Sequence, residues 1–135
     1  MSSVSSNELH NAMRAIGRSY QLMLNAFRMG DWDSFSDAFA VNCLVLPPDG
    51  IPIRGKDDVA LMWKRLKDTG DIARIEIKSD EFVGGKELIV ERGVYKLVDS
   101  QNKLAEQRRF MNVWRDVNGV QVLCTQMYQS TTRKA

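Results

Sequence analysis

The segment CLVLPPDGIPIRGKDDV, residues 43–59, contains the signals for a strand, a loop and a helix in direct succession. Its apolar run, 43–46, has the composition of a buried strand, and the strand is expected to end at Pro47, because proline supplies no N–H for pairing. The Asp-Gly pair at 49–50 favours a turn. The charged residues at 56–58 then open a helix. The segment therefore predicts a loop between the first strand and a helix.

Helical patterns dominate before this segment, and strand patterns follow it. Apolar residues recur at three- and four-residue spacing over 9–27, which is typical of one buried helix face. Asp31 is expected to cap a second helix in which Trp32, Phe35 and Phe39 share a face, and a third spans about 56–68. Beyond Gly70 the pattern changes to alternation with a period of two, with turns at Gly-Gly, 99–102 and Asn-Gly. The expected later strands are 74–78, 87–98, 104–115 and 120–130.

This order predicts a single α+β domain. A chain of 135 residues is long enough for one core. Three helices cannot cover both faces of so long a sheet, so the sheet is expected to curl around them and bury one concave face. The expected boundaries are a flexible N-terminus at 1–7, the domain at 8–131 and a tail at 132–135.

Composition argues against several functional classes. A net charge of +2, from 19 basic and 17 acidic residues spread along the chain, gives no basic stripe for nucleic acid. No apolar run approaches the roughly 18–20 residues that span a bilayer, and the N-terminus lacks a signal core, so a cytoplasmic protein without a membrane partner is expected. Cys43 and Cys124 are predicted to be reduced thiols in separate strands. His10 has no acidic or cysteine cluster near it, so neither metal nor cofactor is expected.

Several motifs together resemble the nuclear transport factor 2-like superfamily over roughly residues 8–131. The similarity is strongest to its SnoaL-like branch, which includes ketosteroid isomerases, polyketide cyclases and the association domain of calcium/calmodulin-dependent kinase II. The motifs are IRGKDDVALMW at 53–63, ERGVYKL at 91–97 and GVQVLCTQMYQS at 119–130. The resemblance implies a cone-shaped, curved, mostly antiparallel sheet wrapped around three N-terminal helices. It also implies an internal cavity with the loop 47–52 at its rim.

The isomerase branch of this family supplies a test for catalysis. Its chemistry needs a carboxylate base at the end of the first strand, and a tyrosine and a protonated acid that donate hydrogen bonds to the enolate. Leu46 stands at the base position, and the nearest carboxylate, Asp49, is equally explained as a turn former. Tyr20 is the candidate tyrosine, and neutral Asn112 falls near the second acid. Catalysis is therefore not favoured, and Tyr20 and Asp49 are the only candidates to carry it.

Strand alternation and the resemblance together give the candidate cavity residues. If Trp114 faces the cavity, then Asn112, Phe110 and Arg108 do so as well. If Arg92 faces it, the buried guanidinium needs a ligand carboxylate or an acidic neighbour, Glu76 or Glu106. The pair 108–109 by itself is typical of a solvated face. The candidate ligand-binding residues are Tyr20, Met23, Trp63, Arg92, Asn112, Trp114, Gln126 and Tyr128.

Two functions remain open at this point. One is a small-molecule-binding domain that takes an apolar or carboxylated ligand, with proton transfer of the isomerase or cyclase type as its catalytic form. The other is an oligomerisation or interaction module without catalysis. In that case Tyr95, Met111 and Val113 would lie on the outer sheet face and build a homodimer or a larger homo-oligomer.

Overall fold

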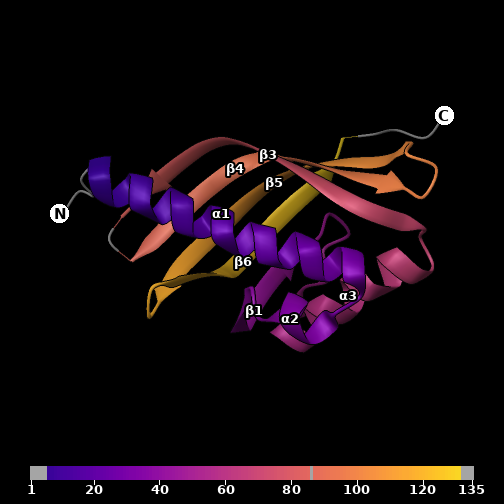
Figure 1. Cartoon of the computed structure of the whole chain (residues 1–135), viewed down its shortest axis with the longest axis horizontal. Coiled ribbons are helices and arrows are strands. Elements are labelled where there is room, and N and C mark those ends of the chain that lie inside the picture. The colour runs from indigo at the N-terminus through magenta and orange to yellow at the C-terminus, as the bar shows by residue number, and fades with distance from the viewer. Residues whose placement is uncertain (1–5, 86, 132–135) are drawn as a thin grey trace.

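The computed structural model describes residues 6–85 and 87–131, which form three helices and one six-stranded sheet (Figure 1). The strand order is β2-β1-β6-β5-β4-β3, and every neighbouring pair is antiparallel except β1 with β6. The expected α+β class is confirmed. The elements are α1 (Ser6–Met29), α2 (Trp32–Ser36), β1 (Phe39–Leu46), β2 (Ile53–Arg54), α3 (Lys56–Asp68), β3 (Ile72–Gly84), β4 (Leu88–Asp99), β5 (Leu104–Val117) and β6 (Val120–Ser130).

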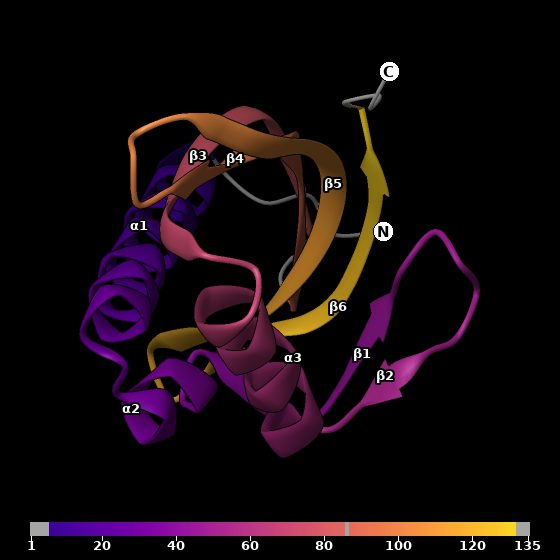
Figure 2. The ribbon, with the colours of Figure 1, turned by 90° about the vertical axis from the view of Figure 1, so that its right-hand side faces the viewer.

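The sheet is curved and unclosed, with β2 and β3 as its free edges. Figure 2 shows it bending around α1 and α3, while the β1–β2 hairpin projects away from α1. Irregularities in the strand register, such as the one in β3 between Ser79 and Glu81 and the one opposite Val113 and Trp114, add to the curvature. The helices therefore lie on the concave face, and the opposite face is open to solvent.

Local sequence signals explain where the elements begin and end. Asp31 accepts a hydrogen bond from the backbone N–H of Ser34 at 3.2 Å and so caps α2, as expected. Gly55, with φ of 85°, opens α3 in a conformation that side chains rarely adopt. The expected third helix has the observed bounds. The first strand, however, begins at Phe39, which the sequence pattern had grouped with the second helix.

The chain ends are described only in part. α1 already includes Ser6 and Asn7, so these two residues are helical although they fall in the segment expected to be a flexible terminus. Residues 1–5 and the tail 132–135 lie outside the described residues. Within residues 6–85 and 87–131, no helix is long and apolar enough to cross a membrane.

An aromatic cluster fixes the helices relative to the sheet. The ring of Phe27 on α1 contacts those of Trp32, Phe35 and Trp63 at centroid distances of 5.7, 6.1 and 6.2 Å. Trp63 on α3 in turn lies 5.8 Å from Tyr95 on β4. These edge and tilted contacts are the arrangements that aromatic pairs prefer. They hold the Trp63 indole over the concave face of the sheet.

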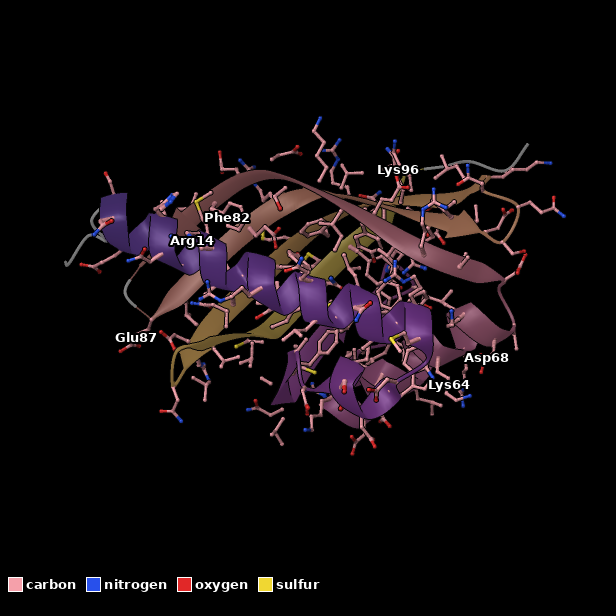
Figure 3. All side chains as sticks on the ribbon, viewed as in Figure 1. Arg14, Lys64, Asp68, Phe82, Glu87 and Lys96 are labelled. Atoms are coloured by element: carbon pink, nitrogen blue, oxygen red, sulfur yellow. The ribbon has the colours of Figure 1, made fainter. Side chains whose placement is uncertain are left out.

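Alternation along β4 decides which charged residue enters the interior. Glu91, Tyr95 and Leu97 are buried beneath the helices. Arg92 and Lys96 are exposed on the other face, and Figure 3 shows Lys96 pointing away from the helices. Because neighbouring residues of a strand point to opposite faces, burying Glu91 places Arg92 outside.

Candidate functional site

A buried carboxylate lies at the centre of the interior. The side chain of Glu91 is 0% exposed, and four donors from three elements surround it. Its Oε1 accepts hydrogen bonds from Tyr20 Oη at 2.6 Å, Trp114 Nε1 at 2.9 Å and Asn112 Nδ2 at 3.3 Å. Its Oε2 accepts a short hydrogen bond from Ser79 Oγ. A carboxylate tolerates burial only when its oxygens are paired in this way.

This carboxylate orients two amide side chains. The indole N–H of Trp114 can only donate, so Glu91 Oε1 must accept. Asn112 therefore turns its NH2 toward Glu91 and Tyr20, and its carbonyl oxygen accepts from Gln126 Nε2 at 2.9 Å. Gln126 is left with its Oε1 facing away from the network. The network of hydrogen bonds thus fixes Gln126 Oε1 as an unpaired acceptor.

The proton of Tyr20 is committed within the same network. Its hydroxyl donates to Glu91 and accepts from Asn112 Nδ2 at 2.9 Å. Burial, followed by the charge of Glu91, raises the pKa of Tyr20 well above its usual value. The hydroxyl of Tyr20 is therefore bonded to the side chains of Glu91 and Asn112.

A small cavity lies beside the free end of this network. Its volume is about 20 Å³, which is room for about one water molecule. Two buried polar atoms, Trp63 Nε1 and Gln126 Oε1, belong to its lining residues and have no hydrogen-bond partner within residues 6–85 and 87–131. The lining residues are Tyr20, Met23, Leu24, Phe35, Phe39, Trp63, Ile75, Ile77, Tyr95, Asn112, Leu123 and Gln126. The interior is thus largely filled by side chains, and one unpaired donor and one unpaired acceptor belong to residues that line the space that remains.

Five of the eight candidate ligand-binding residues meet at this cavity: Tyr20, Met23, Trp63, Asn112 and Gln126. Trp114 is also fully buried on the inner face, where it supports Glu91. Tyr128 lies apart from the cavity, with its ring against Arg108. Whether any of these residues binds a ligand stays a prediction.

Two expectations about arginines are corrected. Arg92 lies on the outer face, where its guanidinium pairs with Glu81 Oε1 at 2.5 Å, so it does not line the interior. Arg108 is buried, as strand alternation from Trp114 predicts and contrary to the interpretation of the pair 108–109 as a solvated face. It pairs twice with Glu106, at 2.7 and 3.2 Å, and lies 4.3 Å from the Tyr128 ring centroid. The ion pair and the aromatic rings replace the water that this cation would otherwise need. Arg109 is exposed as expected.

The loop after β1 also lies elsewhere than expected. Pro47 and Pro48 line a groove of about 750 Å³ together with Met111 and Met127, two residues of the outer sheet face. They do not line the interior cavity. The reason is the hairpin geometry, which carries the loop away from α1 (Figure 2). Asp49, in the same loop, accepts from the backbone N–H of Ile51 at 3.3 Å, which supports the turn interpretation.

Sequence reasoning missed Glu91 and Ser79. Glu91 stands beside Arg92 in an apolar strand, and the sequence pattern made Arg92 the candidate interior residue. The period-two pattern held the signal, because Glu91 alternates with Ile89, Tyr95 and Leu97, which are large and apolar. Ser79 carries no comparable signal, since a serine in a half-exposed edge strand is common.

Comparison with known proteins gives matches to solved structures only. No protein-family model matches the chain, and no curated protein matches it. A nuclear transport factor 2-like protein from Shewanella oneidensis superposes with a TM-score of 0.73 at 13% identity, covering 87% of this chain and 98% of the other. A ketosteroid isomerase-like protein from Erwinia carotovora gives 0.69 at 13% identity, covering 96% and 100%.

A third similar structure is a putative calcium/calmodulin-dependent protein kinase type II association domain from Thiobacillus denitrificans. It gives a TM-score of 0.67 at 14% identity and covers 84% of this chain and 93% of the other. Identities this low show a shared fold and leave the activity open. The resemblance seen in the sequence is confirmed at the level of the fold.

Proposed function

We propose that this chain, which has the nuclear transport factor 2-like fold, binds a small and largely apolar molecule in its interior and carries out no chemistry on it. One observation supports this most directly: Trp63 Nε1 and Gln126 Oε1 are buried beside one cavity without a partner among the described residues. A buried polar group without a hydrogen bond costs roughly 1–3 kcal/mol. A ligand that pairs both atoms regains that free energy on binding.

The same network argues against catalysis. Both oxygens of Glu91 accept hydrogen bonds from neighbouring side chains and Glu91 does not line the cavity, so its carboxylate is not placed to take a proton from a ligand there. The hydroxyl of Tyr20 donates its one hydrogen bond to Glu91 and has none left to donate to a developing oxyanion. Leu46 stands where an isomerase would have its base, and Asp49 serves the turn. A binding protein needs none of these groups to be free.

The groove between α1 and β3 supplies a route into the interior. Its volume is about 580 Å³, and its lining includes Leu24 and Ile75, which also line the inner cavity. These two side chains thus separate the groove from the cavity. β3 is a free edge of the sheet on this side. A ligand larger than a water molecule would enter by displacing Leu24 and Ile75.

The first test is native mass spectrometry of gently purified protein, followed by analysis of the denatured extract. We expect one small organic molecule per chain, with occupancy reduced severalfold by Trp63→Phe. Trp32→Phe is the matched control, because it makes the same change in an indole that packs on Phe27 and Phe35 and does not line the cavity. Protein that carries no bound molecule, and whose unfolding temperature is unchanged by saturating phenol and by saturating toluene, would contradict binding in the interior.

A second function, homodimerisation through the outer face of the sheet, is favoured by a separate observation. Met111 and Met127 are direct partners in the β5–β6 register and are 44% and 51% exposed. They lie in the groove that the loop residues Pro47 and Pro48 border. The ion pair of Arg92 and Glu81 on the outer face lines the same groove. A second copy related by a two-fold axis would therefore place positive and negative side chains opposite this groove. Of the three residues expected on this interface, Tyr95 is corrected: it is buried on the inner face.

The dimer is tested by a charge placed on this face. Met127→Lys would put two like charges near each other across a two-fold interface, so we expect the apparent dissociation constant to rise at least about a hundredfold, equivalent to roughly 3 kcal/mol. Leu22→Lys is the control, because Leu22 is 70% exposed on α1, in the α1–β3 groove and away from the outer face of the sheet. Sedimentation velocity over a concentration series gives the answer. A wild-type chain that stays monomeric at high concentration would rule the dimer out.

A further inference from the structure

We infer that the interior site recognises a hydroxyl group of a neutral alcohol or phenol, an inference that rests on the proposed binding function. The two unpaired atoms are one donor, Trp63 Nε1, and one acceptor, Gln126 Oε1. A hydroxyl accepts and donates through a single oxygen, whereas a carbonyl or ether oxygen only accepts. The cavity of about 20 Å³ holds one such group and not a planar amide, which would need two.

The acceptor at Gln126 cannot exchange its role for that of a donor. A flip of its amide would bring Gln126 Oε1 against the carbonyl oxygen of Asn112, which now accepts from Gln126 Nε2. Asn112 cannot flip in turn, because its NH2 bonds to Glu91 and Tyr20. Glu91 is held as an acceptor by the indole N–H of Trp114. The requirement for a donating ligand group is therefore set by the whole network.

Charge excludes the carboxylated ligand that the sequence left open. The buried carboxyl group of Glu91 lies one residue away in the network, bonded to Asn112 and Tyr20, which both line the cavity. Arg108 packs near Trp63, at 5.9 Å from its ring, but its guanidinium is already paired with Glu106. An anion placed at the cavity would meet a like charge without a free cation in low dielectric.

The other residues that line the cavity indicate the chemistry of the rest of the ligand. Apart from the polar residues named above, the cavity is lined by aliphatic and aromatic side chains. Its outer limit is formed by Leu24 and Ile75, beyond which lies the α1–β3 groove. A small apolar body attached to the hydroxyl would therefore extend from Gln126 and Trp63 toward that groove. Such a site has the usual pattern of an apolar pocket with a few polar groups that fix orientation.

The experiment compares phenol with toluene, which have similar shape and differ in the hydroxyl. Binding is measured by ligand-observed NMR and by the shift of the Trp63 indole N–H signal, which is assigned from its loss in Trp63→Phe. Leu24→Ala is studied beside the wild type, because a shorter side chain at the outer wall admits a ring more easily. We expect phenol to bind at least about tenfold more tightly than toluene. At equal concentrations the Trp63 signal should move further with phenol than with toluene.

The variants Trp63→Phe and Gln126→Leu are expected to reverse the preference, because a hydroxyl without partners must lose water for no gain. Trp32→Phe and Gln129→Leu are the controls, the latter on the exposed end of the same strand. Toluene binding as tightly as phenol would overturn the hydroxyl inference and leave interior binding intact. Failure of both probes in both the wild type and Leu24→Ala would overturn the binding function itself. A preference for phenol that survives Trp63→Phe would place the phenol elsewhere and refute the inference.

Discussion

Replacing Glu91 with alanine should lower the free energy of unfolding by roughly 3–5 kcal/mol, a large share of the total for a domain of this size. The substitution removes the acceptor for Trp114 Nε1, Asn112 Nδ2, Ser79 Oγ and Tyr20 Oη at once. The two hydroxyls can rotate to other partners, but the indole and amide N–H groups are buried. Their lost hydrogen bonds add to the cost of the cavity left behind. Urea unfolding followed by circular dichroism measures the effect.

Glu91→Gln is the matched control for this prediction. Its carbonyl oxygen can take the place of Oε1 and keep the three donors there. Its NH2 then meets Ser79 Oγ, and a serine hydroxyl accepts as well as donates. We expect the glutamine variant to lie within about 1 kcal/mol of the wild type. Equal losses in the alanine and glutamine variants would show that the negative charge, and not the set of acceptors, stabilises this interior.

Periodicity was sufficient to predict most of the fold. The spacing of apolar residues gave the bounds of α3, and strand alternation correctly placed Asn112 and Trp114 on the same buried face. These features are local, because each follows from residues that are close in sequence. The curvature of the sheet is predicted by the count of helices and strands and by the family resemblance.

The predictions that were wrong concern features that depend on contacts between distant parts of the chain. In the segment LIVERGV, 88–94, the apolar residues flank both charges, so the pattern alone allows either Glu91 or Arg92 inside. The choice is made by Tyr20, whose hydroxyl reaches Glu91 from 71 residues away, and by Glu81, which pairs with Arg92 on the outside. The spacing of residues in the sequence does not predict that Tyr20 contacts Glu91 or that Glu81 contacts Arg92.

The size of the cavity and the course of the loop after β1 were beyond sequence reasoning for a similar reason. How far the interior is filled depends on the seating of Trp63 between Phe27 and Tyr95, which come from α1 and β4. The course of the loop depends on the pairing of β1 with β6, from the far end of the chain. The family resemblance predicts the cone-shaped sheet but does not predict how far side chains fill its interior.

The substitution Gly93→Ala tests how rigidly β3 and β5 pack around β4. The Cβ of Gly93→Ala would overlap the backbone carbonyl oxygen of Lys78 on β3 and lie 2.9 Å from Phe110 Cζ on β5. Because one of these neighbours is backbone, relief requires β3 to move, and we expect a loss of about 3 kcal/mol in urea unfolding.

Gly17→Ala provides the comparison for this last variant, because a Cβ at Gly17, inside α1, meets no atom within 4 Å. It should gain about 1 kcal/mol, since alanine favours the helix more than glycine does. A loss below about 1 kcal/mol for Gly93→Ala would contradict the expected rigidity, with overpacking normally costing 1–3 kcal/mol. It would mean that the edge strand β3 yields easily, and the separation of β3 from α1 would then become the simplest way for a ligand to pass Leu24 and Ile75.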